Sequence, residues 1–125
     1  MTHRVQITLG ELQFTALFEE NDAANAIYDV LPFDLPYQTW GDEIYCHIPV
    51  ELKARGGVEI VKVGDLAFWP PGKAFCIFFG PTPASEDERP RAASEVIVFG
   101  RIEGDASALR GVKANTIRVE PMPDE

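Results

Sequence analysis

The chain has 125 residues and a mass of 13.9 kDa, a length that suits one domain whose core is large enough to fold without disulfides or metals. Its 11 Lys and Arg against 20 Asp and Glu give a net charge of −9 at pH 7, which argues against nucleic acid as a partner because phosphate binding needs clustered positive charge. No apolar run reaches the roughly 20 residues of a membrane-spanning helix, and the first residues hold no signal-peptide core. We therefore expect a single cytoplasmic domain over residues 1–125 that binds neither nucleic acid nor membranes.

The two cysteines and two histidines do not follow a metal-binding pattern. Cys46 and Cys76 are 30 residues apart inside expected strands, and the sequence contains no Cys-x-x-Cys pair. Zinc sites normally combine closely spaced Cys and His ligands. We expect two buried free thiols, no metal site and no cofactor.

The first part of the chain predicts a β-hairpin followed by a helix. Apolar and polar residues alternate over 5–9 and again over 12–18, which is typical of half-buried strands. Gly10-Glu11 between them fits a type II′ turn, with glycine at its first central position. A helix capped by Asn21 or Asp22 is expected to run through Leu31 and to end before Pro32.

Most of the remaining chain predicts short strands. Phe33–Pro36 is expected to be a proline-bounded connection, and the charged segment 84–95 a mobile loop. Asp105 can cap a short helical turn over 106–110. The further strands are expected at residues 37–40, 43–48, 58–63, 66–69, 74–79, 96–102 and 116–120.

The stretch from Gly64 to Pro83 is the most distinctive part of the sequence. It contains four of the eight phenylalanines and one of the two tryptophans. It predicts a strand, a turn at 70–73 in which Pro71-Gly72 suits type II geometry, and a second strand over 74–79. That second strand is apolar on both faces, so we expect it to be buried on both sides or to border a cavity. Altogether, about eight short antiparallel strands with one main helix predict a mainly β protein built as a closed barrel.

Three segments resemble a known family. They are Trp-Gly-Asp-Glu-Ile-Tyr at 40–45, the whole of 64–83, and Val-Phe-Gly-Arg-Ile at 98–102. Together they are similar to the small prokaryotic cyclophilin-like domains, and the resemblance extends from the first hairpin to the last strand. It implies a closed, eight-stranded, cyclophilin-type antiparallel β-barrel with a short C-terminal helical turn.

The resemblance to true peptidyl-prolyl isomerases is weaker at the position that matters for catalysis. Those enzymes carry Phe-His-Arg on the strand after their first helix, whereas the matching region here, Tyr37–His47, contains no arginine. Rotating an X–Pro bond means overcoming a barrier of about 18–20 kcal/mol, and a guanidinium next to the prolyl nitrogen would favour the twisted state. Arg55, Arg89, Arg91 or Arg101 could replace it only by reaching in from elsewhere.

The best candidate ligand-binding residues lie on one face of the strand 43–48. Aromatic groups with a carboxylate and an imidazole can hold a peptide or small molecule by stacking and hydrogen bonding. The alternative is a solvated strand face with Trp40 as a partly buried plug, and for Trp69 a role in the core. The candidates on this strand face are Glu43, Tyr45 and His47, with Trp40 just before the strand. Trp69 and Phe78 are added because they could wall an aromatic slot.

We therefore expect a cyclophilin-like binding module for a peptide or small molecule, with no catalytic residues assigned. Two other functions stay open. One is a weak or diverged prolyl isomerase, which rests on fold similarity alone. The other is an assembly protein that forms a homodimer through its barrel surface.

Overall fold

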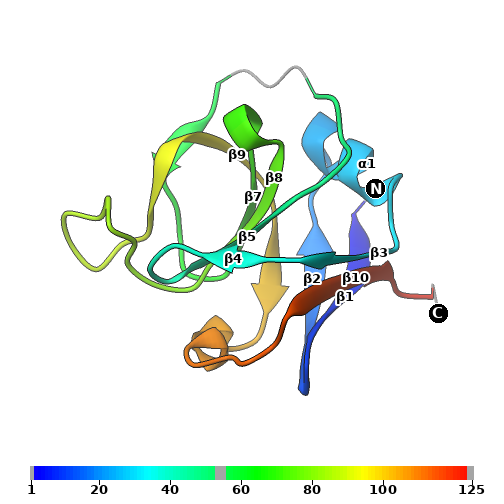
Figure 1. Ribbon diagram of the computed structural model, residues 1–125. Helices are drawn as coiled ribbons and strands as arrows, with labels where there is room; N and C mark the ends of the chain where they lie inside the picture. Colours follow the sequence, from blue (N-terminus) through cyan, green and yellow to red (C-terminus); the bar gives the residue numbers. More distant parts are fainter. Residues whose placement is uncertain (1, 53–55, 124–125) are drawn as a thin grey trace.

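The computed structural model describes residues 2–52 and 56–123, and most of its regular structure is β (Figure 1). One α-helix, two short 3₁₀ helices and ten strands are found in these residues. None of the helices in this part of the chain is long and apolar enough to span a membrane. The strands are β1 (His3–Leu9), β2 (Leu12–Phe18), β3 (Phe33–Pro36), β4 (Gln38–Thr39), β5 (Glu43–His47), β6 (Val58–Ile60), β7 (Asp65–Trp69), β8 (Ala74–Phe78), β9 (Arg91–Glu103) and β10 (Thr116–Pro121).

The strands form one antiparallel sheet in the order β3-β10-β1-β2-β9-β7-β8-β5-β4, with β6 paired to the outer part of β9. β3 and β4, at the two ends of this order, are separated in the chain only by Tyr37. The sheet therefore curls round so that the chain itself joins its ends, but the described hydrogen-bonded order is not closed. The closed eight-stranded barrel expected from the sequence is replaced by an open, ten-stranded sheet.

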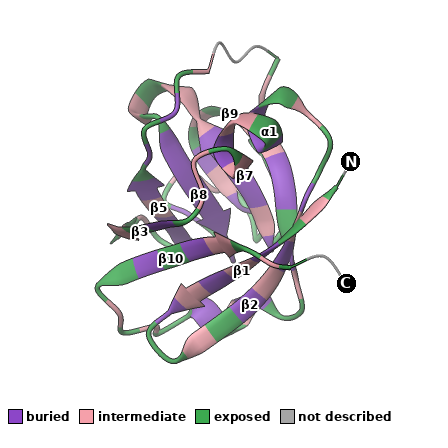
Figure 2. Cartoon of the chain, turned by 90° about the vertical axis from the view of Figure 1, so that its right-hand side faces the viewer, coloured by how far each residue is buried: buried purple, intermediate pink, exposed green. Residues whose placement is uncertain are grey.

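The opening hairpin matches the prediction. Leu9 pairs with Leu12 across a two-residue turn, and Gly10 has the positive φ of 60° that this kind of turn requires. Buried and partly exposed residues alternate along both strands, as Figure 2 shows. The buried side chains belong to the main core.

The helix α1 (Asp22–Tyr28) begins as expected, because the Asn21 side chain accepts a hydrogen bond from the Ala24 amide at 2.8 Å. It ends three residues before the predicted Leu31. The amides of Val30 and Leu31 bond to the carbonyls three residues earlier, so the last turn tightens and the α-helical pattern stops. The apolar side of the helix packs against the main core through Ala23, Ala24 and Ile27.

One segment expected to be a connection, and the last part of the predicted loop 84–95, are strands. Residues 33–36 form β3, which pairs with β10 through Leu35 and Ile117, and β9 already begins at Arg91. In contrast, β6 covers only half of the predicted strand 58–63. Gly100 lies where a β-carbon would be 2.5 Å from the Leu17 carbonyl oxygen, so the close approach of β2 and β9 at this point requires glycine.

The turn between β7 and β8 also differs from the prediction. Residues 70–72 form a 3₁₀ turn, in which the Lys73 amide donates to the Pro70 carbonyl at 3.1 Å. The left-handed residue is Lys73, with a φ of 49°, whereas Gly72 does not have a positive φ. A type II turn with Gly72 in the left-handed region is therefore wrong, and Gly72 is needed for a different reason, described below.

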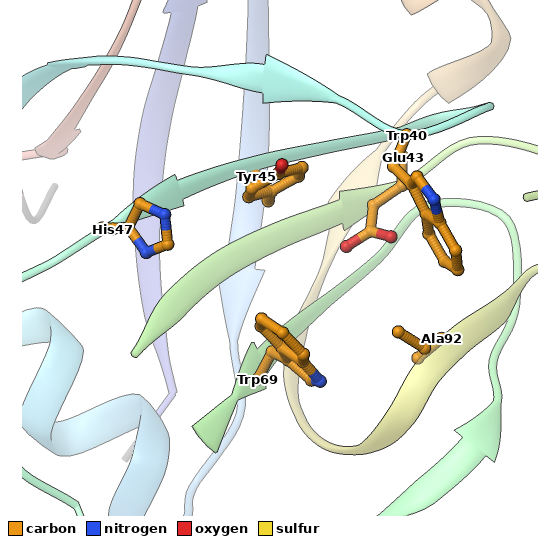
Figure 3. Close-up of a pocket in the computed structure, with 7 residues that line it drawn as sticks. Trp40, Glu43, Tyr45, His47, Trp69 and Ala92 are labelled. Carbon is orange, nitrogen blue, oxygen red and sulfur yellow. The ribbon is translucent and has the colours of Figure 1, made fainter. Parts of the chain in front are cut away.

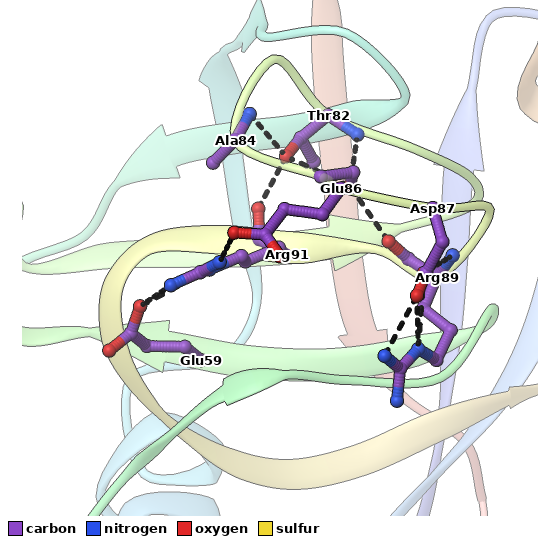
Figure 4. Close-up of polar contacts among 8 residues, drawn as sticks. Glu59, Thr82, Ala84, Glu86, Asp87, Arg89 and Arg91 are labelled. Atoms are coloured by element: carbon purple, nitrogen blue, oxygen red, sulfur yellow. Dashed lines mark hydrogen bonds and ion pairs between the residues drawn. The ribbon is translucent and has the colours of Figure 1, made fainter.

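The segment between β8 and β9 is exposed but tied to the sheet by hydrogen bonds (Figure 4). The Thr82 hydroxyl donates to the Arg91 carbonyl, and the Ser85 hydroxyl donates to the Arg89 carbonyl at 2.7 Å. The Arg91 guanidinium binds Glu59 and Glu86, each at 3.0 Å. These contacts fix the point at which β9 starts.

Candidate functional site

The candidate site lies on the side of the sheet that faces away from the main core. Alternation along β5 directs Ile44 and Cys46 into the main core and Glu43, Tyr45 and His47 to the opposite face. The neighbouring strand β8 is buried over its whole length, because the opposite face carries a second, smaller apolar cluster. That cluster contains Val61, Ala67, Ala74, Cys76, Phe78, Ala92 and Val96, with Tyr45, Trp69 and Val98 packed against it.

A pocket of about 340 Å³ opens above this second cluster (Figure 3). Its volume is at the lower end of the roughly 300–1,000 Å³ usual for small-molecule sites. Figure 3 shows the Glu43 carboxyl pointing into the space between Tyr45, Trp40 and Trp69, with Ala92 on the far wall. The lining residues are Trp40, Glu43, Tyr45, His47, Trp69, Ala92 and Ala93.

Trp69, the last residue of β7, is fixed at both ends of its ring system. Its indole Nε1 donates to the Ser94 hydroxyl on β9 at 2.7 Å. Its six-membered ring lies over Gly72, where a β-carbon would come within 2.7 Å of Cζ3 and 2.8 Å of Cε3. Glycine at position 72 therefore makes room for this wall of the pocket.

Tyr45 and His47 form the β5 side of the pocket. The Tyr45 hydroxyl donates to the Gln38 side-chain oxygen at 2.7 Å, and His47 Nδ1 donates to the Gly72 carbonyl at 2.6 Å. The two rings meet edge to face, with centroids 6.0 Å apart. Hydrogen bonding of His47 Nδ1 to a carbonyl makes this atom the protonated nitrogen of the neutral ring.

Trp40 is placed by the turn between β4 and β5. Its amide donates to the Glu43 carbonyl at 2.9 Å, and Gly41 follows with a φ of 60°. A β-carbon on Gly41 would lie 2.8 Å from the Pro83 ring and 2.9 Å from Thr82. The turn is thus packed against the segment after β8, which holds Trp40 at the rim.

Glu43 is the one buried acidic residue of the site, with 7% of its surface exposed. Burial raises the pKa of its carboxyl to about 7, and a hydrogen bond with the Cys76 thiol lowers it by a smaller amount. Burial also raises the pKa of the Cys76 thiol well above its usual value, and the nearby Glu43 carboxyl adds to this. Near neutral pH the site therefore holds a carboxyl between its two charge states beside an uncharged thiol.

The basic side chains adjacent in sequence to the pocket are bound elsewhere. Lys73 pairs with Glu51, and Arg91 pairs with Glu59 and Glu86. Of the other arginines considered as replacements for a catalytic guanidinium, Arg89 binds Asp87 at 2.8 Å, while Arg101 is exposed on β9 and is not part of the lining. Arg55 lies outside the described residues.

The described lining holds a group suited to proton exchange. A carboxyl with a pKa near 7 can exchange protons at physiological pH, but the described lining offers no serine, threonine or accessible thiol as a nucleophile. The Tyr45 hydroxyl, the Nδ1 atom of His47 and the Trp69 indole N–H already have partners within the protein. Nowhere in the described residues do three His, Cys, Asp or Glu side chains converge as a metal site would require.

Five of the six residues predicted from the sequence line this one pocket. The sixth, Phe78, is completely buried in the second apolar cluster and supports the pocket without lining it. Ala92 and Ala93 were missed because they fall in the segment that the sequence predicts to be a loop. In the sequence, two small side chains interrupt a run of charged residues. This is the only indication there that the strand packs closely against an apolar cluster.

Comparison with known proteins agrees with this architecture. Residues 3–120 match the family model described as cyclophilin-like. A hypothetical protein from Archaeoglobus fulgidus, whose structure was solved in solution, is 35% identical with a TM-score of 0.80, over 96% of this chain and 95% of that one. No curated protein matches the chain significantly. The chain belongs to the cyclophilin-like family.

Proposed function

We propose that this protein is a binding module that receives a small molecule or a peptide side chain in the pocket between Trp40 and Trp69. One observation carries the proposal. Two indoles, a phenol, an imidazole and a buried carboxyl, from two separate strands and a turn, converge on one cavity of about 340 Å³. Concave, mainly apolar sites with a few converging polar groups are typical of ligand-binding sites.

Binding fits the contacts of the lining better than isomerisation does. The aromatic walls are held rigid by partners inside the protein, at Gln38, Ser94 and Gly72. Rigid aromatic walls lose little conformational entropy when a ligand binds. The charged group that points into the cavity is a carboxyl, whereas stabilising a twisted prolyl bond calls for a positive group beside the prolyl nitrogen.

Titration of the protein with a panel of small fragments and short peptides tests the proposal. The two indole N–H resonances in NMR spectra come from Trp40 and Trp69, because the chain contains only two tryptophans. At least one class of compound should shift both resonances saturably. A panel that covers neutral, cationic and anionic compounds and shifts neither resonance would refute the binding function.

A further inference from the structure

In the part of the chain that the structure describes, the Glu43 carboxyl has no positively charged partner. It is more than nine-tenths buried, and the side chain that affects its pKa is the uncharged Cys76 thiol. No ion pair in the described residues includes it, and the flanking cations Lys73 and Arg91 are held by other carboxylates. A buried ionised carboxylate is costly without a compensating charge. Among the described residues no positive group compensates this carboxylate, so a cation bound in the pocket would supply the missing charge.

The walls around this carboxyl are suited to a cation. Figure 3 shows the rings of Trp40, Tyr45 and Trp69 grouped around the Glu43 carboxyl. The faces of tryptophan and tyrosine rings attract positive charge, by about 0.5–1 kcal/mol at exposed sites and about 2 kcal/mol when water is excluded. The net charge of −9 adds a general attraction for cations.

The lining also indicates which kind of cation fits. A guanidinium carries five N–H donors, but the described lining offers only one carboxyl to accept them, that of Glu43, and the Tyr45 hydroxyl is already bonded to Gln38. A metal ion needs several oxygen ligands. An alkylated ammonium group needs few hydrogen-bond acceptors and presents an apolar surface to the rings. Building on the binding function above, we propose that the pocket takes the alkylated ammonium group of a small organic cation, with its methyl groups against Trp40 and Trp69 and its charge beside Glu43.

A matched pair of probes tests this proposal directly. Choline carries a trimethylammonium group, and 3,3-dimethylbutan-1-ol has the same shape with a neutral carbon in place of the nitrogen. Both tryptophans of the chain line the pocket, so tryptophan fluorescence reports on the site with no label. At pH 8 we expect choline to bind at least about 10-fold more tightly than the alcohol, from the ring–cation and carboxylate–cation attraction together.

Substitution of Glu43 separates the contribution of the carboxylate charge to binding from that of the shape of the ligand. Glu43→Gln should weaken choline binding by about 10-fold or more and leave binding of the alcohol within about twofold. Glu11→Gln is the matched control, because Glu11 is an exposed carboxylate in the β1–β2 turn outside the pocket lining. It removes the same unit of net charge and should leave choline binding unchanged. If Glu43→Gln does not fold, Trp40→Leu provides the second test, and should weaken choline binding more than binding of the alcohol.

The pH dependence gives an independent readout, because choline itself does not titrate. Affinity for choline should rise by about 10-fold from pH 6 to pH 8, as the carboxyl ionises. The titratable groups that face Glu43 are Cys76 on β8 and Tyr45 and His47 on β5, while β7 and β9 present Trp69, Ala92 and Ala93. The Glu43→Gln variant still contains His47. A loss of the pH dependence of choline affinity in this variant would therefore show that the dependence comes from Glu43.

The possible outcomes distinguish this proposal from the binding function on which it rests. Equal affinity for choline and the alcohol, both sensitive to Trp40→Leu, would overturn the cation proposal and leave a neutral-ligand site. Preferential binding of arginine-like guanidinium probes over choline would also overturn it. If neither probe binds and the broader fragment and peptide panel leaves both indoles unshifted, the cation proposal and the binding function both fail.

Discussion

The Glu43 carboxyl on β5 and the Cys76 thiol on β8 lie together beneath the candidate pocket, where each affects the pKa of the other. They lie on neighbouring strands, since Cys76 pairs directly with Tyr45 and Glu43 with Phe78. Burial disfavours the charged form of both groups. At neutral pH the folded protein therefore keeps the thiol neutral and holds a proton on Glu43 for part of the time.

This pair predicts an unusual dependence of stability on pH. Between about pH 4.5 and about pH 7 the folded chain binds a proton at Glu43 that the unfolded chain has released. The free energy of unfolding should therefore fall as pH rises through this range, by roughly 2 kcal/mol from this group. Urea midpoints at pH 5 and pH 8 measure the effect, and Glu43→Gln should reduce the difference by about that amount. An unchanged difference in the variant would contradict the assignment to Glu43.

Truncation of the aromatic walls should abolish ligand binding without unfolding the protein. Trp40 and Tyr45 are half-buried, and neither belongs to the main core. Trp40→Ala or Tyr45→Ala should weaken the tightest ligand of the fragment and peptide panel by about 10-fold or more. Far-ultraviolet circular dichroism checks that the fold is retained. Unchanged affinity in both variants would rule out this pocket as the binding site.

Gly72→Ala should disturb the Trp69 wall. A β-carbon at this position would overlap the six-membered ring of Trp69, so the ring has to move and lose its bond to Ser94. We expect a loss of stability of about 1–3 kcal/mol and a change in tryptophan emission. In a Trp69→Leu background, which removes the overlapping ring, the same substitution should cost much less. Equal costs in the two backgrounds would show that Gly72 matters for another reason.

Efficient prolyl isomerisation is not expected, because the charged group that points into the pocket is a carboxyl, whereas a twisted prolyl bond calls for a positive group beside the prolyl nitrogen. Exchange NMR on an X–Pro peptide, at high protein concentration, should show the uncatalysed cis–trans rate. A clear enhancement that disappears in Trp40→Ala would replace the binding proposal by a catalytic one in the same pocket.

The assembly function considered from the sequence makes a separate prediction. If the protein works as a binding module with a complete pocket in each chain, light scattering should give a mass of 13.9 kDa at all concentrations. A mass that doubles with concentration would favour the homodimer. The same sample should then be titrated with choline, to show whether dimer formation affects the pocket.

The sequence predicts those parts of the fold that depend on neighbours in the chain. The hairpin at Gly10 and the cap at Asn21 are local, and both are confirmed. Phe33–Pro36 looked like a connection because two prolines frame it, yet it pairs with β10, some 80 residues later in the chain. Pairing of this kind depends on the completed sheet, which local propensity does not encode.

The candidate site likewise combines features that the local sequence predicts with features that depend on the folded structure. Alternation along β5 is enough to group Glu43, Tyr45 and His47, because strand geometry places every second residue on one face. The position of Ala92 depends on how β9 bends across the second apolar cluster. The role of Gly72 depends on the orientation of one tryptophan ring, and the spacing of residues in a sequence does not encode that orientation.

The junction at Tyr37 joins the two ends of the sheet without hydrogen bonds of the sheet between β3 and β4. All other neighbours in the sheet order are held together by rows of hydrogen bonds, whereas β3 and β4 are held by the covalent chain alone. A small outward swing of β4 at this junction breaks no ladder bond to β3, so it should cost less than separating two strands that share a ladder. Trp40 follows directly after β4. Of all the pocket walls, the one that carries Trp40 should yield first to a ligand larger than the cavity, and hydrogen exchange should begin earliest at Gln38 and Thr39 among the strand residues of the pocket.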